Sequence, residues 1–221
     1  MSYKSDFNHL VWFLRCNGCR VILCNKKLLL LPNTKNQKCY GYFWVKSIHS
    51  TDYPFIYLAT KGYSYKEKLM VLGHEAGHIK CLAETPRSDH QLGKAWDIYD
   101  QWIDGTNYSD SLLRKVRRII LLSEYTADRD SYGIFRDLGL SCIRNRDFVD
   151  LLILSANLYS LTLRWSFGRR VNYVGTMILV AEQKKLGIRN KWLSRRELLT
   201  EPSDKTLKLM DRYFVENGGK L

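Results

Sequence analysis

The chain is 221 residues long, with 45% hydrophobic and 26% charged residues. This length suits one domain with its own core, and the hydrophobic fraction excludes a mainly disordered protein. The formal net charge of +13 at pH 7 indicates a surface that attracts phosphate backbones or acidic proteins.

The N-terminal part of the chain is predicted to form one short helix and a small antiparallel sheet. Apolar residues recur with helical spacing over residues 7–14. Strand-forming residues dominate four later runs, residues 20–24, 27–31, 40–48 and 55–59. The first two of these flank a turn at Asn25 and Lys26, and a polar loop follows over residues 32–38.

Residues 69–82, LMVLGHEAGHIKCL, contain an HExxH motif. His74 and His78 are four positions apart, so on a helix both imidazoles point to the same side. Two such rings can hold one metal ion, most often zinc. Glu75 then lies near the open side of the metal, where a carboxylate can accept a proton from a bound water. The alternative is a structural helix with two ordinary histidines beside a surface glutamate.

The residues around the motif favour the metal site. Apolar flanks indicate a buried helix, in which unliganded polar side chains carry a large desolvation cost. Gly73 and Gly77 lie inside the helix, where each costs about 1 kcal/mol relative to alanine. We therefore expect another backbone or a substrate to pass close to these glycines.

A catalytic zinc ion usually has three protein ligands, so a third one is needed. A helical pattern over residues 109–138 contains Glu124 and Asp128, which share one face of that helix. Two carboxylates in apolar surroundings repel each other unless a cation lies near them. We assign Glu124 as the third ligand, and Asp128 as the acceptor of a hydrogen bond from the other ring nitrogen of a ligating histidine. The alternative is a solvated acidic patch beside Asp130.

HEAGH followed by the ExxAD of residues 124–128 resembles the gluzincin plan of zinc metallopeptidases. Residues 55–78 are similar to the soluble, cytosolic ImmA/IrrE type, which is often found in phages or mobile elements. Residues 124–134, EYTADRDSYGI, also resemble the HtpX/prenyl-protease type of membrane protein, and HEAGH occurs in membrane AAA proteases with an aspartate ligand.

The resemblance to zinc metallopeptidases covers residues 5–138. It implies a zincin-like core over residues 1–140, in which the strand of residues 55–59 pairs with an extended substrate. An internal strand with no open edge is the alternative.

Residues 85–106 join the two ligand-bearing helices and are predicted to be a polar connection, because they contain Pro86, Gly93 and Gly105. His90 in this segment is a rival third ligand. It lies twelve residues after His78, which does not fit the six-residue spacing of metzincins, so Glu124 is preferred.

The remaining chain, residues 141–221, is predicted to be a basic helical extension packed on the same domain. Helical patterns occupy residues 146–165, 171–185, 194–200 and 205–215. Nine Lys or Arg lie within residues 164–196, and ten lie within residues 1–66. Trp165, Tyr173 and Trp192 could stack on bases. A nucleic acid or an acidic protein is therefore an expected partner, and a solubilising surface is the alternative.

The six cysteines are expected to be free thiols in a cytoplasmic protein, or in the host cytoplasm if the chain is encoded by a phage. The initial residues do not read as an export signal, and the longest apolar run, residues 149–163, is too short to span a bilayer. A structural zinc site from Cys16, Cys19, Cys24 and Cys39 is conceivable; the alternative is a helix-to-strand turn. Cys81 is expected to pack rather than to bind metal.

The sequence therefore predicts an α+β, zincin-like protein that acts as a zinc metalloendopeptidase with one Zn²⁺ per chain. Zinc would polarise the scissile carbonyl and lower the pKa of its water toward ~7, and Glu75 would carry the proton from that water to the leaving amine. The side chain that would donate a hydrogen bond to the oxyanion is not identified by the sequence. The candidates are Tyr159, Arg164, Arg169, Arg170 and Tyr173. The second hypothesis is a non-catalytic zincin-fold binding or regulatory protein.

Overall fold

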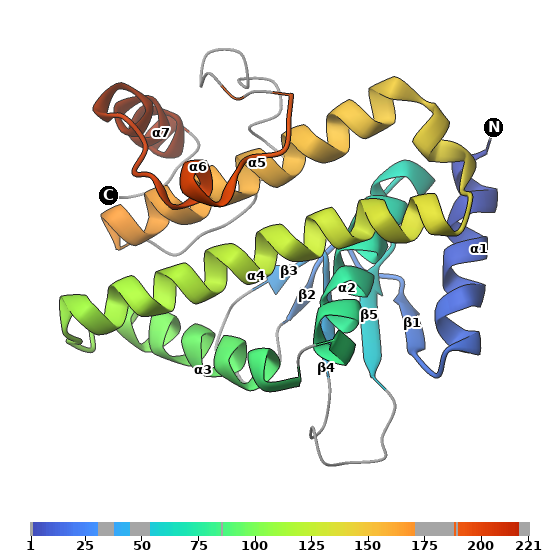
Figure 1. Ribbon diagram of the computed structural model, residues 1–221, viewed down its shortest axis with the longest axis horizontal. Helices are drawn as coiled ribbons and strands as arrows, with labels where there is room; N and C mark the ends of the chain where they lie inside the picture. Colours follow the sequence, from blue (N-terminus) through green and yellow to red (C-terminus); the bar gives the residue numbers. More distant parts are fainter. Residues whose placement is uncertain are drawn as a thin grey trace. The chain divides into compact units, whose positions relative to one another are not determined.

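The computed structural model describes residues 2–30, 38–44, 54–84, 86–170, 188 and 190–216, and its fold is α+β, as predicted (Figure 1). The helices are α1 (Tyr3–Cys16), α2 (Tyr65–Glu84), α3 (Pro86–Ile103), α4 (Asp110–Asp137), the 3-10 helix η1 (Ser141–Arg144), α5 (Arg146–Arg169), α6 (Arg195–Leu199) and α7 (Asp204–Glu216). The strands are β1 (Arg20–Cys24), β2 (Leu29–Leu30), β3 (Lys38–Cys39), β4 (Gly41–Trp44) and β5 (Phe55–Ala59).

The chain divides into two compact units. The first comprises Met1–Ser88 and Thr126–Val149, and the second comprises Asp89–Tyr125 and Asp150–Leu221. Helices α4 and α5 therefore each contribute residues to both units. The predicted helix of residues 171–185, Tyr173, and the ends of the strands predicted at 27–31 and 40–48 lie outside the described residues.

The sheet of the first unit has the strand order β1-β5-β4 and is mixed rather than antiparallel. β4 is antiparallel to β5, but β1 is parallel to β5, with Arg20 opposite Phe55. The two strands expected around the turn at Asn25 and Lys26 are β1 and β2, but β2 pairs with β3 in a separate two-stranded sheet. The packing of α1 on α2 explains this order. Because β1 begins just after α1, and β5 ends just before α2, the two packed helices bring these strands side by side.

Helix α2 packs on β4 and β5, which confirms that the sheet lies on the HExxH helix. The buried core at this contact includes Ile56 and Leu58 of β5 and Leu69 and Leu72 of α2, all with 0% exposure. Gly41 in β4 lies at the closest approach, since a Cβ atom there would be 2.8 Å from Cγ1 of Val71. The strand thus needs glycine at this position to lie against α2.

In the second unit, the segment predicted to be a polar connection is helix α3. Leu92, Ala95 and Tyr99 are buried against α4 and α5 residues, and their spacing marks one helical face. Pro86 does not oppose the helix because it occupies the first helical position, where no backbone N–H is needed. Gly93 is tolerated because it is exposed on the other side of the helix.

The other helices of the second unit follow the predicted patterns. Trp165 of α5 is buried against Met210 of α7, and its indole Nε1 donates a hydrogen bond of 2.8 Å to Asp211. Among the described helices, none has a stretch both long and apolar enough to span a bilayer.

Candidate metal centre

Helix α2 begins after Ser64, which caps the helix and lies ten residues before the first histidine of the motif. The backbone N–H of Ser64 donates to Oε2 of Glu67 at 2.7 Å, and the backbone N–H of Glu67 donates to Oγ of Ser64 at 3.3 Å. This reciprocal pair is a capping box, which satisfies two backbone donors that a helix start leaves unpaired. It places His74 and His78 in the interior of a regular helix, where their four-residue spacing puts them on one face.

The two imidazoles approach each other at their Nε2 atoms. The Nε2 atoms of His74 and His78 lie 3.1 Å apart, and the ring planes meet at 88°. Two nitrogens bound to one tetrahedral zinc ion, each at about 2.0–2.1 Å, are separated by roughly 3.3 Å. The spacing of the two imidazoles therefore suits a shared ion.

Glu124 of α4 completes a group of three. One ligand atom from each of His74, His78 and Glu124 lies within 4.8 Å of the others, and in the described part of the chain no other set of three His, Cys, Asp or Glu side chains forms such a group. His78 and Glu124 are each 6% exposed. Two imidazole nitrogens and one carboxylate oxygen are a common zinc donor set. These three residues therefore form a group that could hold a metal ion.

Asp128 lies one helical turn after Glu124 and contacts the first histidine. Its Oδ1 atom is 2.8 Å from Nδ1 of His74. When the carboxylate accepts a hydrogen bond from Nδ1, the neutral imidazole keeps its lone pair on Nε2, as metal binding requires. The expected contact of Asp128 with a histidine of the motif is thus present, and it favours that tautomer of His74.

The two glycines of the motif lie where α4 approaches α2. A Cβ atom at Gly73 would be 2.2 Å from Cζ of Phe135, so that position admits the Phe135 ring. At Gly77 the close neighbour is the backbone of Ala127. The expectation that another backbone passes close to the motif is confirmed at Gly77, and at Gly73 the neighbour is a side chain.

Glu75, the predicted general base, is 7% exposed. The charge of Glu75 affects the thiol of Cys39 in β3. Burial, and next the negative charge of Glu75, raise the pKa of the Cys39 thiol to about 12. Cys39 is therefore a neutral thiol at neutral pH. His90 falls in α3 at a position whose side chain lies outside the described part of the chain.

Sequence reasoning missed one aromatic contact at the site. The ring of Phe43 in β4 stacks on the ring of His78, with 5.1 Å between centroids and 20° between planes. The available signal was the alternation of a strand, in which Gly41 and Phe43 share a face. Phe43 thus reaches the second histidine of the motif from the edge of the sheet.

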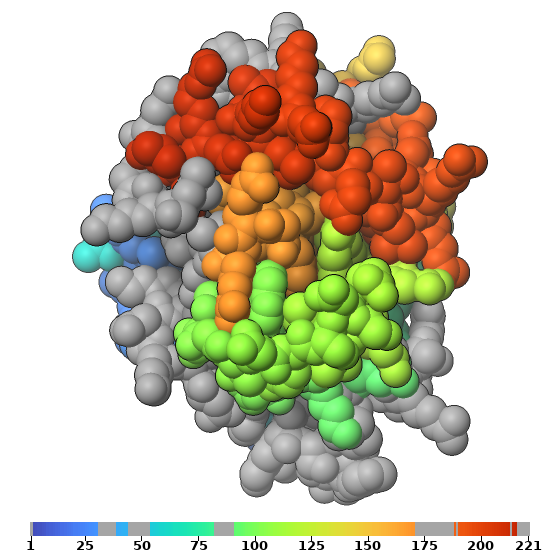
Figure 2. All heavy atoms as spheres, turned by 90° about the vertical axis from the view of Figure 1, so that its left-hand side faces the viewer, coloured from blue at the N-terminus to red at the C-terminus, as the bar shows by residue number. Residues whose placement is uncertain are grey.

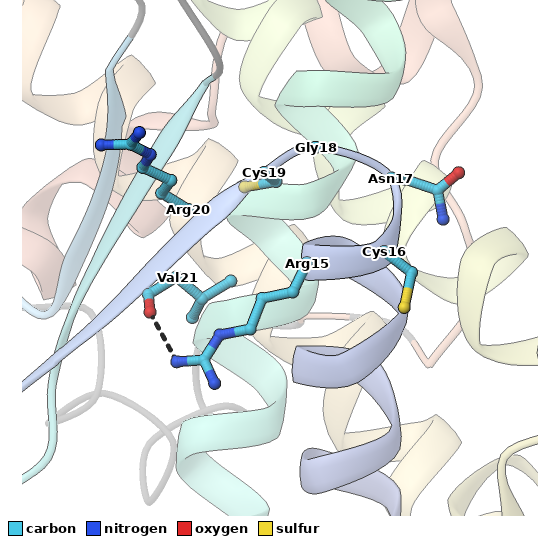
Figure 3. A pocket seen from close by; sticks show the side chains of 7 residues that line it. All are labelled: Arg15, Cys16, Asn17, Gly18, Cys19, Arg20 and Val21. Atoms are coloured by element: carbon cyan, nitrogen blue, oxygen red, sulfur yellow. Dashed lines mark hydrogen bonds between the residues drawn. The ribbon is translucent and has the colours of Figure 1, made fainter.

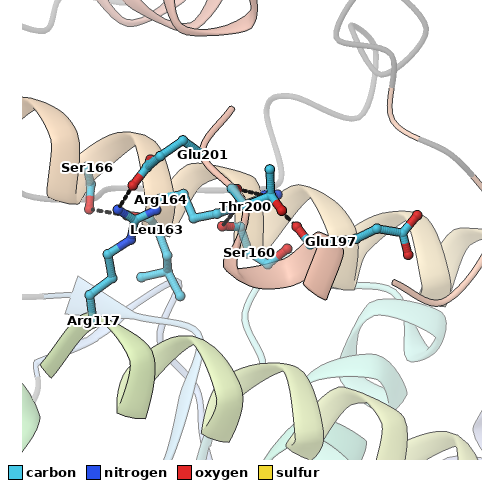
Figure 4. Close-up of polar contacts among 8 residues, drawn as sticks. All are labelled: Arg117, Ser160, Leu163, Arg164, Ser166, Glu197, Thr200 and Glu201. Carbon is cyan, nitrogen blue, oxygen red and sulfur yellow. Dashed lines mark hydrogen bonds and ion pairs between the residues drawn. The ribbon is translucent and has the colours of Figure 1, made fainter. Parts of the chain in front are cut away.

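The candidate hydrogen-bond donors to the oxyanion that the structure describes all contact other residues of the second unit. Arg164 lies in α5, and its Nε donates to Ser160 O while Nη1 donates to the carbonyls of Glu197 and Thr200 (Figure 4). Burial lowers the pKa of Arg164 to about 10, with a smaller contribution from the charge of Arg117. Three other candidates are also engaged: Arg169 with Asp211, Arg170 with the carbonyls of Trp102 and Thr106, and Tyr159 with an apolar cluster.

The cysteines of the conceivable second metal site do not come together. Figure 3 shows Cys16 at the end of α1 and Cys19 just before β1, with side chains that point in different directions from the turn at Gly18. Cys16 is exposed and Cys19 is buried, and all six cysteines are free thiols. No group of three that includes a cysteine is present among the described side chains. Gly18, with φ of 81°, marks the helix-to-strand turn that was the alternative.

Comparisons of the chain with protein-family models, with curated proteins and with solved structures find no match. The geometry of the site is therefore the basis for a functional proposal: a His-His-Glu group on two helices, with a buried glutamate beside the first histidine.

Proposed function

We propose that this protein is a zinc-dependent metallopeptidase that hydrolyses peptide bonds in a protein or peptide substrate. The observation that carries the proposal is the grouping of His74, His78 and Glu124, with ligand atoms within 4.8 Å of one another, around the HExxH helix. The Asp128 carboxylate supports it, because it holds His74 in the tautomer that binds metal. Glu75 supports hydrolysis in particular, because the glutamate of an HExxH motif can act as the general base of a metalloprotease.

A bound zinc ion would supply Lewis acidity to the scissile carbonyl and lower the pKa of a water molecule. Glu75 then accepts the proton of the attacking water and passes it to the leaving amide nitrogen. The carbon–oxygen bond forms, the carbon–nitrogen bond breaks, and the products are a carboxylate and an amine.

The sheet offers one edge for an extended substrate beside the site. β5 lies between β1 and β4, so its backbone groups are paired within the sheet, and the expectation that residues 55–59 pair with a peptide is wrong. In this sheet of described strands, β4 is the edge strand whose residue Phe43 touches His78. We therefore assign β4 as the strand that would pair with a substrate backbone.

Metal analysis and turnover by paired variants test this function. The wild-type protein should carry one zinc ion per chain and cleave fluorescently labelled casein in a chelator-sensitive way. Glu75→Gln should keep the zinc and lose turnover by at least about 100-fold, whereas Glu124→Ala should lose the zinc. Full activity of Glu75→Gln would refute its role as base, and stoichiometric zinc in Glu124→Ala would remove it from the ligand set.

A second candidate function is a binding protein that recognises a nucleic acid, and helix α7 favours it. Its apolar side packs on Trp165, while Lys205, Lys208 and Arg212 line a hollow of about 390 Å³ with Leu209. Figure 2 shows α7 (red) at the surface of the second unit beside α5 (orange). Three cations on one helix face repel one another by a few tenths of a kcal/mol per pair, a cost that a bound phosphate backbone would reverse.

Fluorescence anisotropy with a labelled 20-nucleotide single strand and the matching duplex tests this candidate. Binding should weaken as the salt concentration rises, because counterions are released from the nucleic acid. The triple variant Lys205→Gln, Lys208→Gln, Arg212→Gln should bind more weakly and show a shallower salt dependence than a control in which Lys26, Lys27 and Lys61 are changed to Gln. Equal loss in both variants would assign the binding to net charge alone.

A further inference from the structure

The side chain of Phe43 connects the edge strand β4 to the candidate metal site. Side chains alternate along a strand, so Gly41 and Phe43 face α2 while Tyr42 faces the other way. The contact of Gly41 with Val71 fixes this direction. Val71 and His78 are seven positions apart, which places them two turns along the same face of α2. The register of β4 on α2 thus brings Phe43 over His78.

Each of the two histidines has a contact that restrains its ring. His74 has the carboxylate of Asp128 at 2.8 Å from Nδ1. His78 is enclosed by rings: Phe43 stacks on it with 20° between the planes, and His74 meets it edge-on at 88°. A parallel ring at 5.1 Å restricts rotation of the imidazole about its χ2 angle, because turning the ring would lose the stack and clash with Phe43.

We propose that Phe43 is a positioning residue for His78, through which the edge strand sets the plane of this imidazole and so the affinity and coordination geometry of the metal. This inference rests on the proposed metal site. It also gives that site a means of regulation, because a peptide that pairs with β4 stiffens the strand that carries Phe43. By thermodynamic linkage, metal binding and peptide binding at β4 then strengthen each other.

The test compares Phe43→Leu with two reference variants. Phe43→Tyr keeps a ring that can stack. Tyr42→Leu removes an aromatic ring from the neighbouring position of the same strand, where it stacks on Tyr57 with 4.9 Å between centroids on the opposite face. Zinc affinity is measured by competition with a chelator. Coordination geometry is measured from the visible absorption of the Co²⁺ form, whose band positions and intensities depend on ligand number and symmetry.

Phe43→Leu should bind zinc about 10-fold more weakly and shift the Co²⁺ spectrum, because 10-fold is the lower end of what residues that contact metal ligands contribute to affinity. Phe43→Tyr and Tyr42→Leu should behave like the wild type. An unchanged affinity and spectrum in Phe43→Leu would overturn the proposal. So would an equal loss in Tyr42→Leu, since that would assign the effect to the integrity of the strand. A wild-type protein that binds no metal would instead refute the proposed function itself, and circular dichroism of each metal-free variant identifies any that fails to fold.

Discussion

Gly77 of α2 lies against the carbonyl oxygen of Ala127 in α4, so closely that a Cβ atom on Gly77 would be 2.1 Å from that oxygen. Neither helix backbone can yield without moving as a whole. We expect Gly77→Ala to lower the free energy of unfolding by about 1–3 kcal/mol or more, as overpacking does. It should also displace Asp128, the residue after Ala127, and so weaken zinc binding. Urea denaturation and zinc titration measure the two effects.

Gly93 provides the control for this substitution. It lies in the interior of α3, and a Cβ atom there meets nothing within 4 Å. Alanine favours a helix over glycine by about 0.8–1.0 kcal/mol, so Gly93→Ala should raise the free energy of unfolding by up to that amount. Destabilisation by both substitutions would show that glycine is needed for some reason other than close approach.

Replacing Asp128 tests the tautomer argument. Asp128→Ala removes the acceptor that keeps the proton on Nδ1 of His74, so a part of the population places the proton on Nε2 instead. We expect zinc affinity to fall 10- to 100-fold, as for other orienting carboxylates. Asp137→Ala removes a carboxylate from the exposed end of the same helix and should leave the affinity unchanged. The readout is chelator competition, and a wild-type affinity in Asp128→Ala would contradict the assignment.

The thiols should differ in their rate of alkylation. Burial raises the pKa of Cys19 to about 11 and that of Cys142 to about 12. At pH 8, roughly one Cys19 side chain in a thousand is then a thiolate, the form that reacts. With iodoacetamide and peptide mapping, exposed Cys16 should react first, and Cys19, Cys39 and Cys142 should react only after denaturation. Equal rates for Cys16 and Cys19 would indicate a reactive pair.

Acid should destabilise the second unit through Glu197. Hydrogen bonds from the Ser194 backbone and side chain, and then from Lys191, lower the pKa of Glu197 to about 2. An unfolded glutamate has a pKa of about 4.3. The stabilisation is therefore fully present above about pH 4.3 and is lost as the pH falls toward 2. The midpoint of thermal unfolding should fall less steeply over this window in Glu197→Gln, and Ser194→Ala should show an intermediate slope. Identical slopes in all three proteins would contradict this prediction.

The spacing of apolar residues in the sequence was sufficient to predict the two helices that carry the site. The pattern of residues 109–138 predicts α4 closely, and the spacing of Glu124 and Asp128 predicts the contact of Asp128 with His74. The helix itself, and the shared face of Glu124 and Asp128, are local consequences of a 3.6-residue helical period, whereas the contact with His74 also needs α4 to lie against α2. Gly139 after α4 has φ of 62°, as expected of a helix-ending glycine.

Sequence spacing failed where distant contacts decide the structure. No local signal distinguishes a hairpin of β1 with β2 from the parallel pairing of β1 with β5, because the choice depends on how α1 packs on α2. Pro86 and Gly93 favour a polar connection over the residues of α3, but a first-turn proline and an exposed glycine are both compatible with a helix. Phe43 was missed because its position over His78 follows from the strand order and register.

The parallel pairing of β1 with β5 has a consequence for how the protein folds. It joins Arg20 to Phe55, 35 positions later in the chain. The entropy of closing that loop must be lost before any of the pairing is gained, which makes such contacts slow to form. Helix α2 can begin at its own capping box before this step, and its packing on α1 then brings the two strands together. Assembly of the sheet, rather than formation of the helix, should therefore limit the rate at which the histidines reach their final surroundings.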